Sequence, residues 1–217
     1  MSKKANVGVL ISGRGSNLQA LLDAARAPDY PARIALVICN VEEAQGLDRA
    51  RAEQVPTAVI QQKDFADRES FDAAMDTALR AAEIDYVCLA GFMRILSGSF
   101  VDGWRDRLIN IHPSLLPSFK GLNVHDRVVE AGVRITGCTV HFVRPEMDSG
   151  PIIAQAAAPV RHDDDAEALA ARVLELEHRI YPLALGLLAA GRLRISGEKV
   201  LIEDPQDADG DLLQPPD

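Results

Sequence analysis

The first ninety residues alternate short apolar runs with longer stretches of helical periodicity, and this alternation constrains the fold more than any other feature. It is the pattern of repeated strand–helix–strand units in a parallel sheet. The apolar runs are nearly continuous, which is typical of strands covered on both faces by helices. We predict strands at residues 7–11, 33–39, 57–60 and 86–90, with helices at residues 17–26, 47–54 and 68–82 between them.

After Gly91 the rhythm changes. We predict one more buried strand at residues 108–111, an antiparallel pair at 136–143 and 151–157, a helix at 163–190 and a hairpin at 192–195 and 199–202. The long helix has an acidic start, as a helix N-terminus prefers, and we expect Pro182 to kink or divide it.

The predicted fold is therefore α/β, with a mostly parallel central sheet flanked by helices and an antiparallel C-terminal extension. We expect one domain over residues 1–203. Residues 204–217 are rich in Asp and Pro and poor in large apolar side chains, so we expect a flexible acidic tail there.

Composition narrows the classes of function. The 217 residues are 47% hydrophobic, enough to bury a globular core. The net charge of −9 makes nucleic acid or an anionic membrane an unfavourable partner, although a local basic pocket for one small anion stays open. No apolar run is long enough to span a bilayer or to form a signal-peptide core, so we expect a soluble, cytoplasmic protein.

Neither the cysteines nor most histidines show a metal-binding pattern. The cysteines are Cys39, Cys88 and Cys138. They are widely spaced within or at the end of apolar runs, without a CxxC pair, so we expect small buried hydrophobic residues. The histidines other than His112 are His125, His141, His162 and His178. They lack HExxH spacing, so solvation or core hydrogen bonding is expected, and we predict no metal.

A glycine-rich loop follows the first predicted strand. It reads Ser12-Gly13-Arg14-Gly15-Ser16-Asn17 and passes directly into a predicted helix. Such a loop directs backbone N–H groups and the positive end of the helix dipole toward an anion, and its glycines allow close approach. Ser16 and Asn17 can either cap the helix or hydrogen-bond phosphate oxygens.

This loop does not match two common phosphate motifs. A P-loop needs Gly-Lys-Ser/Thr. A dinucleotide site needs a third glycine and an acidic residue near the end of the second strand, where this chain has Asn40. A tight strand-to-helix turn explains the same residues, so the loop alone leaves both interpretations open.

Asn110 and His112 lie at the end of the fifth predicted strand. Residues two apart in a strand share a face, so both side chains should project together at the carboxyl edge, where open α/β sheets bind ligands. An amide donor beside a titratable imidazole suits oxyanion stabilisation and general acid–base catalysis.

Asp148 lies in the polar loop between the two antiparallel strands and could bring a carboxylate to that imidazole. A carboxylate there would favour the protonated, donating form of the ring. Each residue also has an ordinary explanation: a histidine before Pro113 can bond backbone carbonyls, and residues 148–151 are favourable turn sequence. The convergence of Asn110, His112 and Asp148 in one fold favours a catalytic site.

Five segments together resemble the phosphoribosylglycinamide formyltransferase family of folate-dependent enzymes. They are SGRGSNLQA from Ser12, AGFMRIL from Ala90, INIHPSLLP from Ile109, HFV from His141 and MDSGPII from Met147. The similarity runs in order from the first strand to Pro182. It implies a Rossmann-like formyltransferase domain that moves a formyl group from 10-formyltetrahydrofolate to the amino group of glycinamide ribonucleotide in purine synthesis.

The resemblance also implies roles for residues. Asn110, His112 and Asp148 match the family's catalytic trio. Ribonucleotide contacts fall on Gly15, Ser16 and Asn17 at the phosphate end and on Glu177 at the ribose. Folate-facing positions are Arg68, Met93, Arg94, Ile95, Leu96, Asn110, Arg144, Pro145, Glu146, Met147 and Asp148.

Several of these positions have competing structural explanations. Met93, Ile95 and Leu96 would also fit a core, while Arg68 and Arg94 would fit a solvated surface. Glu177 would fit an exposed helical position, as most such carboxylates do. Asn123, often histidine in the family, and Leu174, polar in some relatives, depart from the family pattern.

The implied reaction is direct transfer. The substrate amine attacks the formyl carbon, the Asn110 amide and protonated His112 hold the oxyanion, and Asp148 orients His112, directly or through a water. Neither a covalent enzyme intermediate nor a metal is required. We expect small-molecule substrates, no nucleic-acid or membrane partner, and a monomer or homodimer.

Other functions share this domain. Formyltetrahydrofolate deformylase, a hydrolase, resembles the chain at the trio but has an additional N-terminal regulatory domain. Methionyl-tRNA formyltransferase has an additional C-terminal domain and must bind RNA, which the acidic net charge disfavours. The length of the chain disfavours both enzymes. A non-catalytic folate- or nucleotide-binding protein is disfavoured because all three chemical residues are present.

Overall fold

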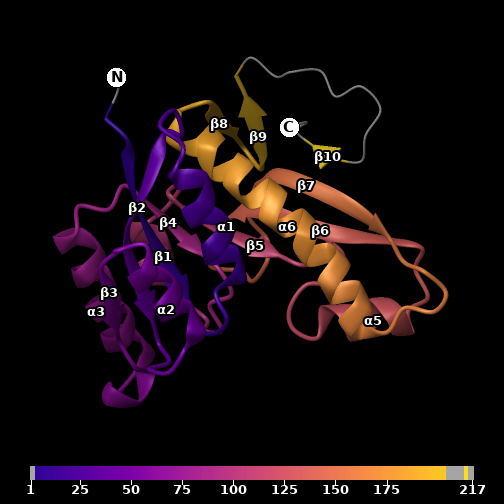
Figure 1. The fold of residues 1–217 in the computed structure, drawn as a ribbon, viewed down its shortest axis with the longest axis horizontal. Coiled ribbons are helices and arrows are strands. Elements are labelled where there is room, and N and C mark those ends of the chain that lie inside the picture. Colours follow the sequence, from indigo (N-terminus) through magenta and orange to yellow (C-terminus); the bar gives the residue numbers. More distant parts are fainter. Residues whose placement is uncertain (1–2, 204–212, 215–217) are drawn as a thin grey trace. The chain divides into compact units, whose positions relative to one another are not determined.

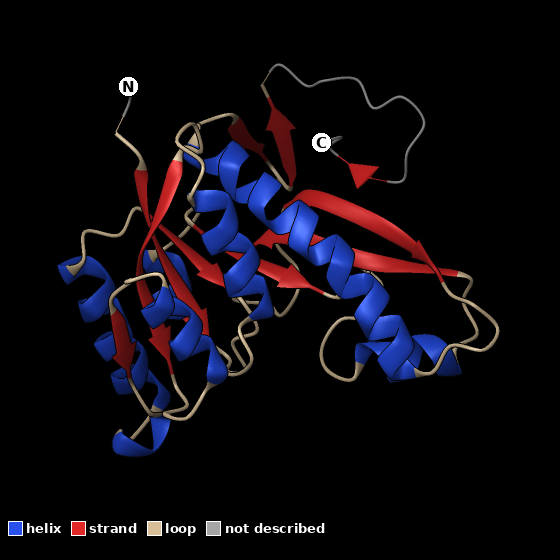
Figure 2. Cartoon of the chain, in the orientation of Figure 1, coloured by secondary structure: helices blue, strands red, loops and turns tan. Residues whose placement is uncertain are grey.

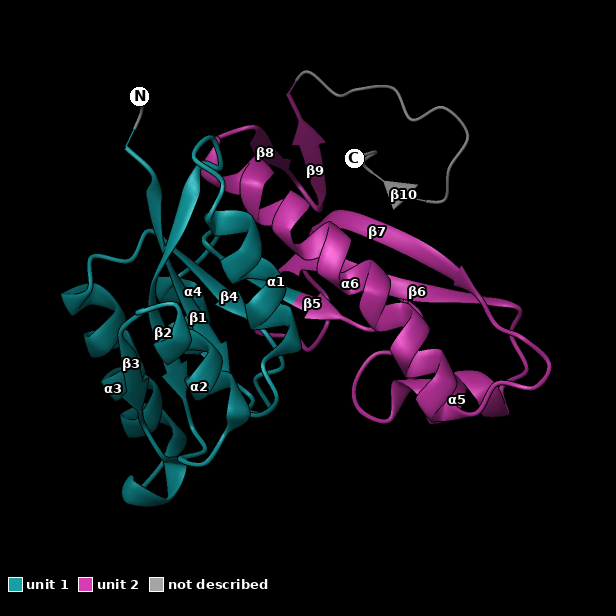
Figure 3. Ribbon diagram, viewed as in Figure 1, with its two compact units in different colours: residues 1–110 teal, residues 111–217 magenta. Residues whose placement is uncertain are grey.

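The computed structural model describes residues 3–203 and 213–214 of the chain. It divides into two compact units, residues 1–110 and residues 111–217 (Figure 3). The boundary falls inside strand β5 (Leu108–His112). The single domain expected over residues 1–203 stays a prediction.

The first unit is built on parallel strands in the order β5-β4-β1-β2-β3. Their bounds are β1 (Ala5–Ile11), β2 (Ala32–Cys39), β3 (Thr57–Val59) and β4 (Tyr86–Leu89). Val9 lies opposite Val37 of β2 and Cys88 of β4. All three side chains are fully buried, so β1 forms the centre of this unit's core.

Helices flank these strands, as Figure 2 shows. They are α1 (Ser16–Ala25), α2 (Gln45–Ala52), α3 (Arg68–Ala81) and α4 (Gly98–Gly103), with a 3-10 turn at Gln62–Asp64. Helix α3 begins at a capping box in which the Asp67 carboxylate accepts from Ser70 N at 2.7 Å. Its buried residues, Phe71, Met75 and Leu79, recur at the helical spacing that predicted it.

The second unit pairs β6 (Ile135–Phe142) with β7 (Ile152–Pro159) in antiparallel register. Helix α6 (Ala166–Ala189) packs on this pair, as Figure 1 shows, and buries Leu169, Val173 and Ile180. The remaining elements are α5 (Val124–Glu130), the hairpin β8 (Leu193–Ser196) with β9 (Lys199–Ile202), and β10 (Leu213–Gln214) against β7.

The predicted fold class is confirmed: strands that are mostly parallel, flanked by helices, are followed by an antiparallel C-terminal part. The short helices α4 and α5 were not predicted. Pro182 lies inside α6 without dividing it, because buried residues on both sides, including Ile180 and Leu185, hold one helix face against its neighbours.

Most of the predicted tail, residues 204–212 and 215–217, lies outside the described residues. Leu213 and Gln214 are described and pair with Ala156 and Gln155 of β7, and the flexible tail stays a prediction. Across the described residues, no helix has the length and apolar character needed to cross a membrane.

Candidate active site

The glycine loop begins helix α1 through Gly15, whose φ of 69° lies in the left-handed region. A Cβ at Gly15 would lie 2.6 Å from the Cα of Gly46, and backbone atoms cannot move aside as a flexible side chain can. Glycine is therefore required here both for its conformation and for its lack of volume. The N-cap residue of helix α1 is Gly15, which has no side chain, so Ser16 and Asn17 lie in the first turn of the helix rather than at the N-cap position.

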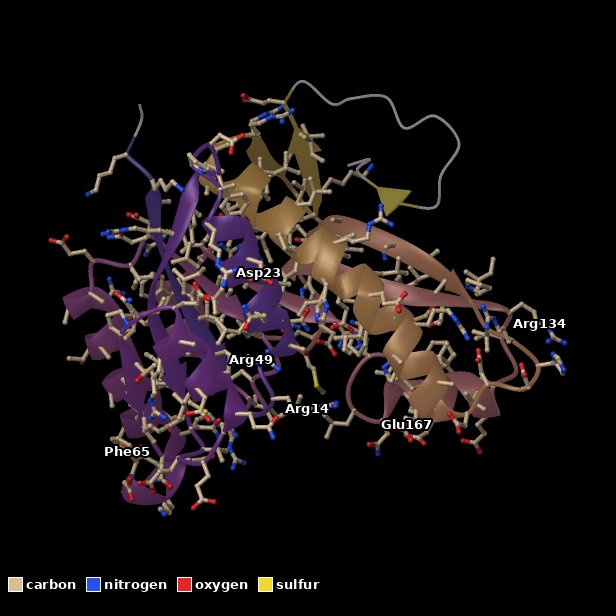
Figure 4. All side chains as sticks on the ribbon, in the orientation of Figure 1. Arg14, Asp23, Arg49, Phe65, Arg134 and Glu167 are labelled. Atoms are coloured by element: carbon tan, nitrogen blue, oxygen red, sulfur yellow. The ribbon has the colours of Figure 1, made fainter. Side chains whose placement is uncertain are left out.

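Helix α2 supports this loop from the side. Gly46 N donates to the Gly13 carbonyl at 3.0 Å, and Arg49 Nε donates to the Arg14 carbonyl at 2.9 Å. Arg14 and Arg49 are labelled in Figure 4. Neither Gly46 nor Arg49 was identified from the sequence; a glycine at the start of the second predicted helix was the only signal.

A second loop joins β4 to α4 and contains Met93, Arg94, Ile95 and Leu96. Met93 and Ile95 are 64% and 63% exposed, whereas Leu96 is buried, so the core alternative holds for Leu96 alone. Arg94 is exposed, as is Arg68 at the first position of α3. The loop thus presents two apolar side chains to solvent, which suits contact with a flat apolar ligand.

Both ends of this loop are tied to the first unit by backbone donors. Met93 N donates to Ser12 Oγ at 2.8 Å, and Ser97 N donates to the buried Asp72 carboxylate at 2.6 Å. The exposed residues between them therefore extend from a fixed frame.

Strand β5 carries two of the predicted catalytic residues. Asn110, opposite Leu89 of β4, and His112 are two positions apart in this strand, so their side chains leave the same face, as predicted. Ile111 between them is buried. His112 is also buried, with 6% of its surface exposed.

Both ring nitrogens of His112 face acceptor oxygens. Nε2 lies 3.0 Å from the Phe119 carbonyl, and Nδ1 lies 3.5 Å from Asp148 Oδ2. A carbonyl oxygen only accepts, so Nε2 carries a hydrogen. The 3.5 Å separation is an ion-pair distance rather than a short hydrogen bond. The structure thus brings His112 and Asp148 together, with an acceptor oxygen on each side of the ring.

Asp148 is fixed by backbone geometry. Its φ is 50°, a left-handed conformation that Asp tolerates better than most residues, and its Oδ2 accepts from Gly121 N at 2.8 Å. Two residues later, a Cβ at Gly150 would lie 1.6 Å from the Phe142 carbonyl, so only glycine fits where the chain returns toward β7. The turn interpretation and the catalytic interpretation of this segment are therefore compatible.

His141 shares the same carboxylate. Its Nδ1 lies 3.0 Å from the Phe142 carbonyl, and its Nε2 lies 4.0 Å from Asp148 Oδ1. Burial lowers the pKa of His141, the nearby charges of His112 and Lys120 lower it further, and the Phe142 carbonyl and Asp148 oppose this. The expected core hydrogen bonding is confirmed, but the contact with Asp148 was not predicted from the sequence.

His125, on α5, is half-buried, and within the described residues its Nδ1 has no hydrogen-bond partner. Burial lowers the pKa of His125, and the charge on His112 lowers it further against the opposing effect of Asp126. Three imidazoles and one carboxylate therefore influence one another in this unit, and we call His112, His125, His141 and Asp148 the imidazole cluster.

The loop after His112 is anchored to the antiparallel pair by buried Thr139. Thr139 Oγ1 donates to the Ser114 carbonyl at 2.7 Å and accepts from Leu116 N at 3.1 Å and from Gln155 Nε2 at 3.0 Å. Since Phe119 follows in the same loop, these bonds help to fix the carbonyl that His112 contacts. Thr139 was not identified from the sequence.

The remaining predicted residues lie on two elements of the second unit. Glu177 is on α6 and only 7% exposed, so the exposed-carboxylate explanation is wrong. Arg144 is half-buried and donates to the Val143 carbonyl at 3.1 Å. The exposed members of the same loop are Pro145, Glu146 and Met147.

A cysteine nucleophile has no support. All three cysteines are buried, and burial raises the pKa of the Cys39 and Cys138 thiols, with the charge of Glu177 adding to the effect at Cys138. Among the described residues, no group of three His, Cys, Asp or Glu side chains is arranged to hold a metal ion.

With this geometry established, comparison with known proteins is informative. Residues 5–185 match the family described as formyl transferase. The chain belongs to the formyl transferase family. It is 44% identical to phosphoribosylglycinamide formyltransferase of Haemophilus influenzae, over 87% of this chain and 89% of that protein.

Longer relatives and solved structures agree with this assignment. The chain is 54% identical to the trifunctional purine biosynthetic protein adenosine-3 of Bos taurus over 89% of its own length, but spans only 19% of that protein. The crystal structure of glycinamide ribonucleotide transformylase 1 from Symbiobacterium toebii has a TM-score of 0.92 and 47% identity, covering 94% of this chain and 96% of that chain. The crystal structure of a formyltetrahydrofolate deformylase from Pseudomonas syringae has a TM-score of 0.87 and 26% identity, covering 94% of this chain and 67% of that chain.

Proposed function

We propose that the chain transfers the formyl group of 10-formyltetrahydrofolate to the amino group of glycinamide ribonucleotide, a step of purine biosynthesis. The observation that carries the proposal is the buried His112 beside Asp148, at the end of the strand that also carries Asn110. The named relatives support the ribonucleotide as acceptor, and the family implies a folate-type formyl donor.

The reaction proceeds by direct attack of the substrate amine on the formyl carbon. The carbonyl oxygen becomes an oxyanion, which accepts hydrogen bonds from the Asn110 amide and from Nε2–H of protonated His112. The formyl oxygen then replaces the Phe119 carbonyl as acceptor for Nε2. The attacking nitrogen loses a proton, the bond between the formyl carbon and the folate nitrogen breaks, and that nitrogen gains a proton.

Asp148 supplies the negative charge that stabilises protonated His112 on its Nδ1 side. Its own position depends on the Gly121 N–H bond and on the turn at Gly150. Asp148 therefore orients the imidazole and keeps it a donor without entering covalent chemistry.

The substrates are assigned to different loops. Gly15, Ser16 and Asn17 receive the ribonucleotide phosphate at the start of α1, where the helix dipole and the absence of a side-chain cap favour an anion. Glu177 holds the ribose. The formyl folate contacts Arg68 and the loop of Met93 to Leu96, together with Arg144 to Asp148.

Formyltetrahydrofolate deformylase is the second candidate, because a deformylase structure superimposes with a TM-score of 0.87. Its identity of 26% is well below the 47% of the transformylase structure, which favours the ribonucleotide acceptor. In a deformylase, water takes the place of the amine and formate leaves.

The deciding experiment is a folate absorbance assay with and without glycinamide ribonucleotide, while formylated ribonucleotide and free formate are both measured. We expect formylated product only when the ribonucleotide is present. Formate release without an acceptor would instead identify a deformylase. Folded protein that binds either ligand but yields neither product would contradict both enzymatic functions.

A further inference from the structure

Asn40 is a buried polar residue that the proposed function does not use. It lies just beyond β2, at the position where a dinucleotide site would carry an acid, and only 7% of its surface is exposed. Its Oδ1 accepts a hydrogen bond of 2.6 Å from the Ser12 hydroxyl. This hydrogen bond joins a buried side chain to the first residue of the glycine loop.

The Ser12 hydroxyl has a second bond, to the other loop. It accepts from Met93 N at 2.8 Å, while Ser12 N donates to the Gly91 carbonyl at 3.2 Å. A hydroxyl has one hydrogen and two lone pairs, so its donation to Asn40 leaves a lone pair for the Met93 N–H. The result is a directed chain from Met93 through Ser12 to Asn40, which joins the ends of three neighbouring strands.

We propose that Ser12 and Asn40 are positioning residues for the formyl-folate loop. Ser12 fixes the backbone of Met93, and Asn40 acts through Ser12 by fixing the direction of its hydroxyl. The other end of the loop is held separately by Asp72 at Ser97 N, so loss of the Ser12 bond releases one end only. This inference rests on the proposed function, since it takes the Met93 loop as the folate contact.

The test is a steady-state comparison of wild type, Ser12→Ala, Asn40→Ala and the double variant. Ser12→Ala should raise the KM for 10-formyltetrahydrofolate about fivefold, because one net hydrogen bond corresponds to roughly a two- to tenfold change in an equilibrium constant. The KM for glycinamide ribonucleotide should change by less than about twofold. Asn40→Ala should give a smaller rise in the folate KM.

The double variant distinguishes a shared role from two separate ones. If Asn40 acts through Ser12, the folate KM of the double variant should equal that of Ser12→Ala, and the two effects should not multiply. Ser12→Thr, which keeps the hydroxyl, should restore the wild-type folate KM. Ser99→Ala is the matched control, because within the described residues that exposed hydroxyl has a single hydrogen bond, with Ser97 Oγ at 3.1 Å.

An unchanged folate KM in Ser12→Ala, or an equal rise in both KM values, would overturn the proposal. Effects that multiply in the double variant would overturn the role of Asn40. If Ser12→Ala does not fold, Asn40→Ala provides the test. An unchanged folate KM in Asn40→Ala would then overturn the proposal. Wild-type protein that transfers no formyl group would instead contradict the proposed function.

Discussion

The glycine loop and the imidazole cluster are built from different parts of the chain. The loop is built from backbone: Gly15 approaches Gly46, and backbone carbonyls of the loop accept bonds from α2. The cluster is built from side-chain atoms, with His112 and His141 facing one carboxylate, that of Asp148. The loop should therefore be sensitive to added volume, and the cluster to the loss of one polar atom.

The strongest test of this comparison is His112→Ala. Removal of the donor for the oxyanion should lower kcat about 1000-fold, within the range expected for general acid–base and oxyanion groups. The measurement is kcat for formyl transfer, with a circular dichroism spectrum to verify folding. His162→Ala is the control, since its imidazole is 89% exposed, and it should match wild type. Near-normal turnover by His112→Ala would remove His112 from the mechanism.

Asp148→Asn should have the next largest effect. The amide oxygen can still accept from Gly121 N, but the charge that stabilises protonated His112 is lost, so kcat should fall about 100-fold. The measurement is kcat near neutral pH. Asp163→Asn removes a carboxylate that is 72% exposed and has no role in the proposed site, so its kcat should match that of wild type. Equal losses in both variants would show that overall charge, not the pairing with His112, matters.

Gly15→Ala tests the loop through volume alone. The new Cβ would meet backbone at 2.6 Å and require a positive φ, so we expect about 2 kcal/mol of lost stability and a roughly tenfold higher KM for the ribonucleotide. The measurements are urea unfolding and steady-state kinetics. Gly13→Ala is matched within the same loop, because a Cβ there meets nothing within 4 Å. If both variants behave alike, the steric explanation is wrong.

The sequence could predict those features that local patterns of residues determine. The parallel strands and their helices follow from apolar periodicity, and residues on one strand, such as Asn110 and His112, share a face by geometry alone. The approach of Asp148 to His112 was expected as a possibility, because a polar loop followed the right strand. Local patterns therefore predicted the fold and allowed for the approach of Asp148 to His112.

Contacts between distant segments left no local signal. Thr139 anchors Ser114, 25 residues away in the chain, and Gly46 approaches Gly15 across 31 positions. Periodicity identifies which side of an element is buried but not which polar atom meets which across a core. The burial of Glu177 has the same origin, since α6 packs a carboxylate where helical statistics favour exposure.

Thr139→Val should have a smaller effect than the changes above. The substitution keeps the shape but leaves Leu116 N without its acceptor in a buried position, so stability should fall by about 2 kcal/mol. The loop that holds the Phe119 carbonyl should then loosen, and kcat should fall about fivefold. Thr139→Ser keeps the hydroxyl and should restore kcat. A Ser variant as impaired as the Val variant would mean that packing, not hydrogen bonding, anchors the loop.

The smallest expected effect is a pH dependence of stability through His141. Burial lowers its pKa in the folded chain, so below about pH 6.5 the unfolded chain takes up a proton that the folded chain does not. Stability should therefore fall as the pH drops from about 6.5 toward the lowered pKa of His141.

His141→Gln removes this titration while His125 and Asp148 remain. Between pH 7.5 and pH 5.5 the free energy of unfolding in urea should decrease in wild type. In this variant the decrease should be about 1 kcal/mol smaller. Parallel pH profiles for the two proteins would mean that His141 binds its proton equally well in the folded and unfolded states.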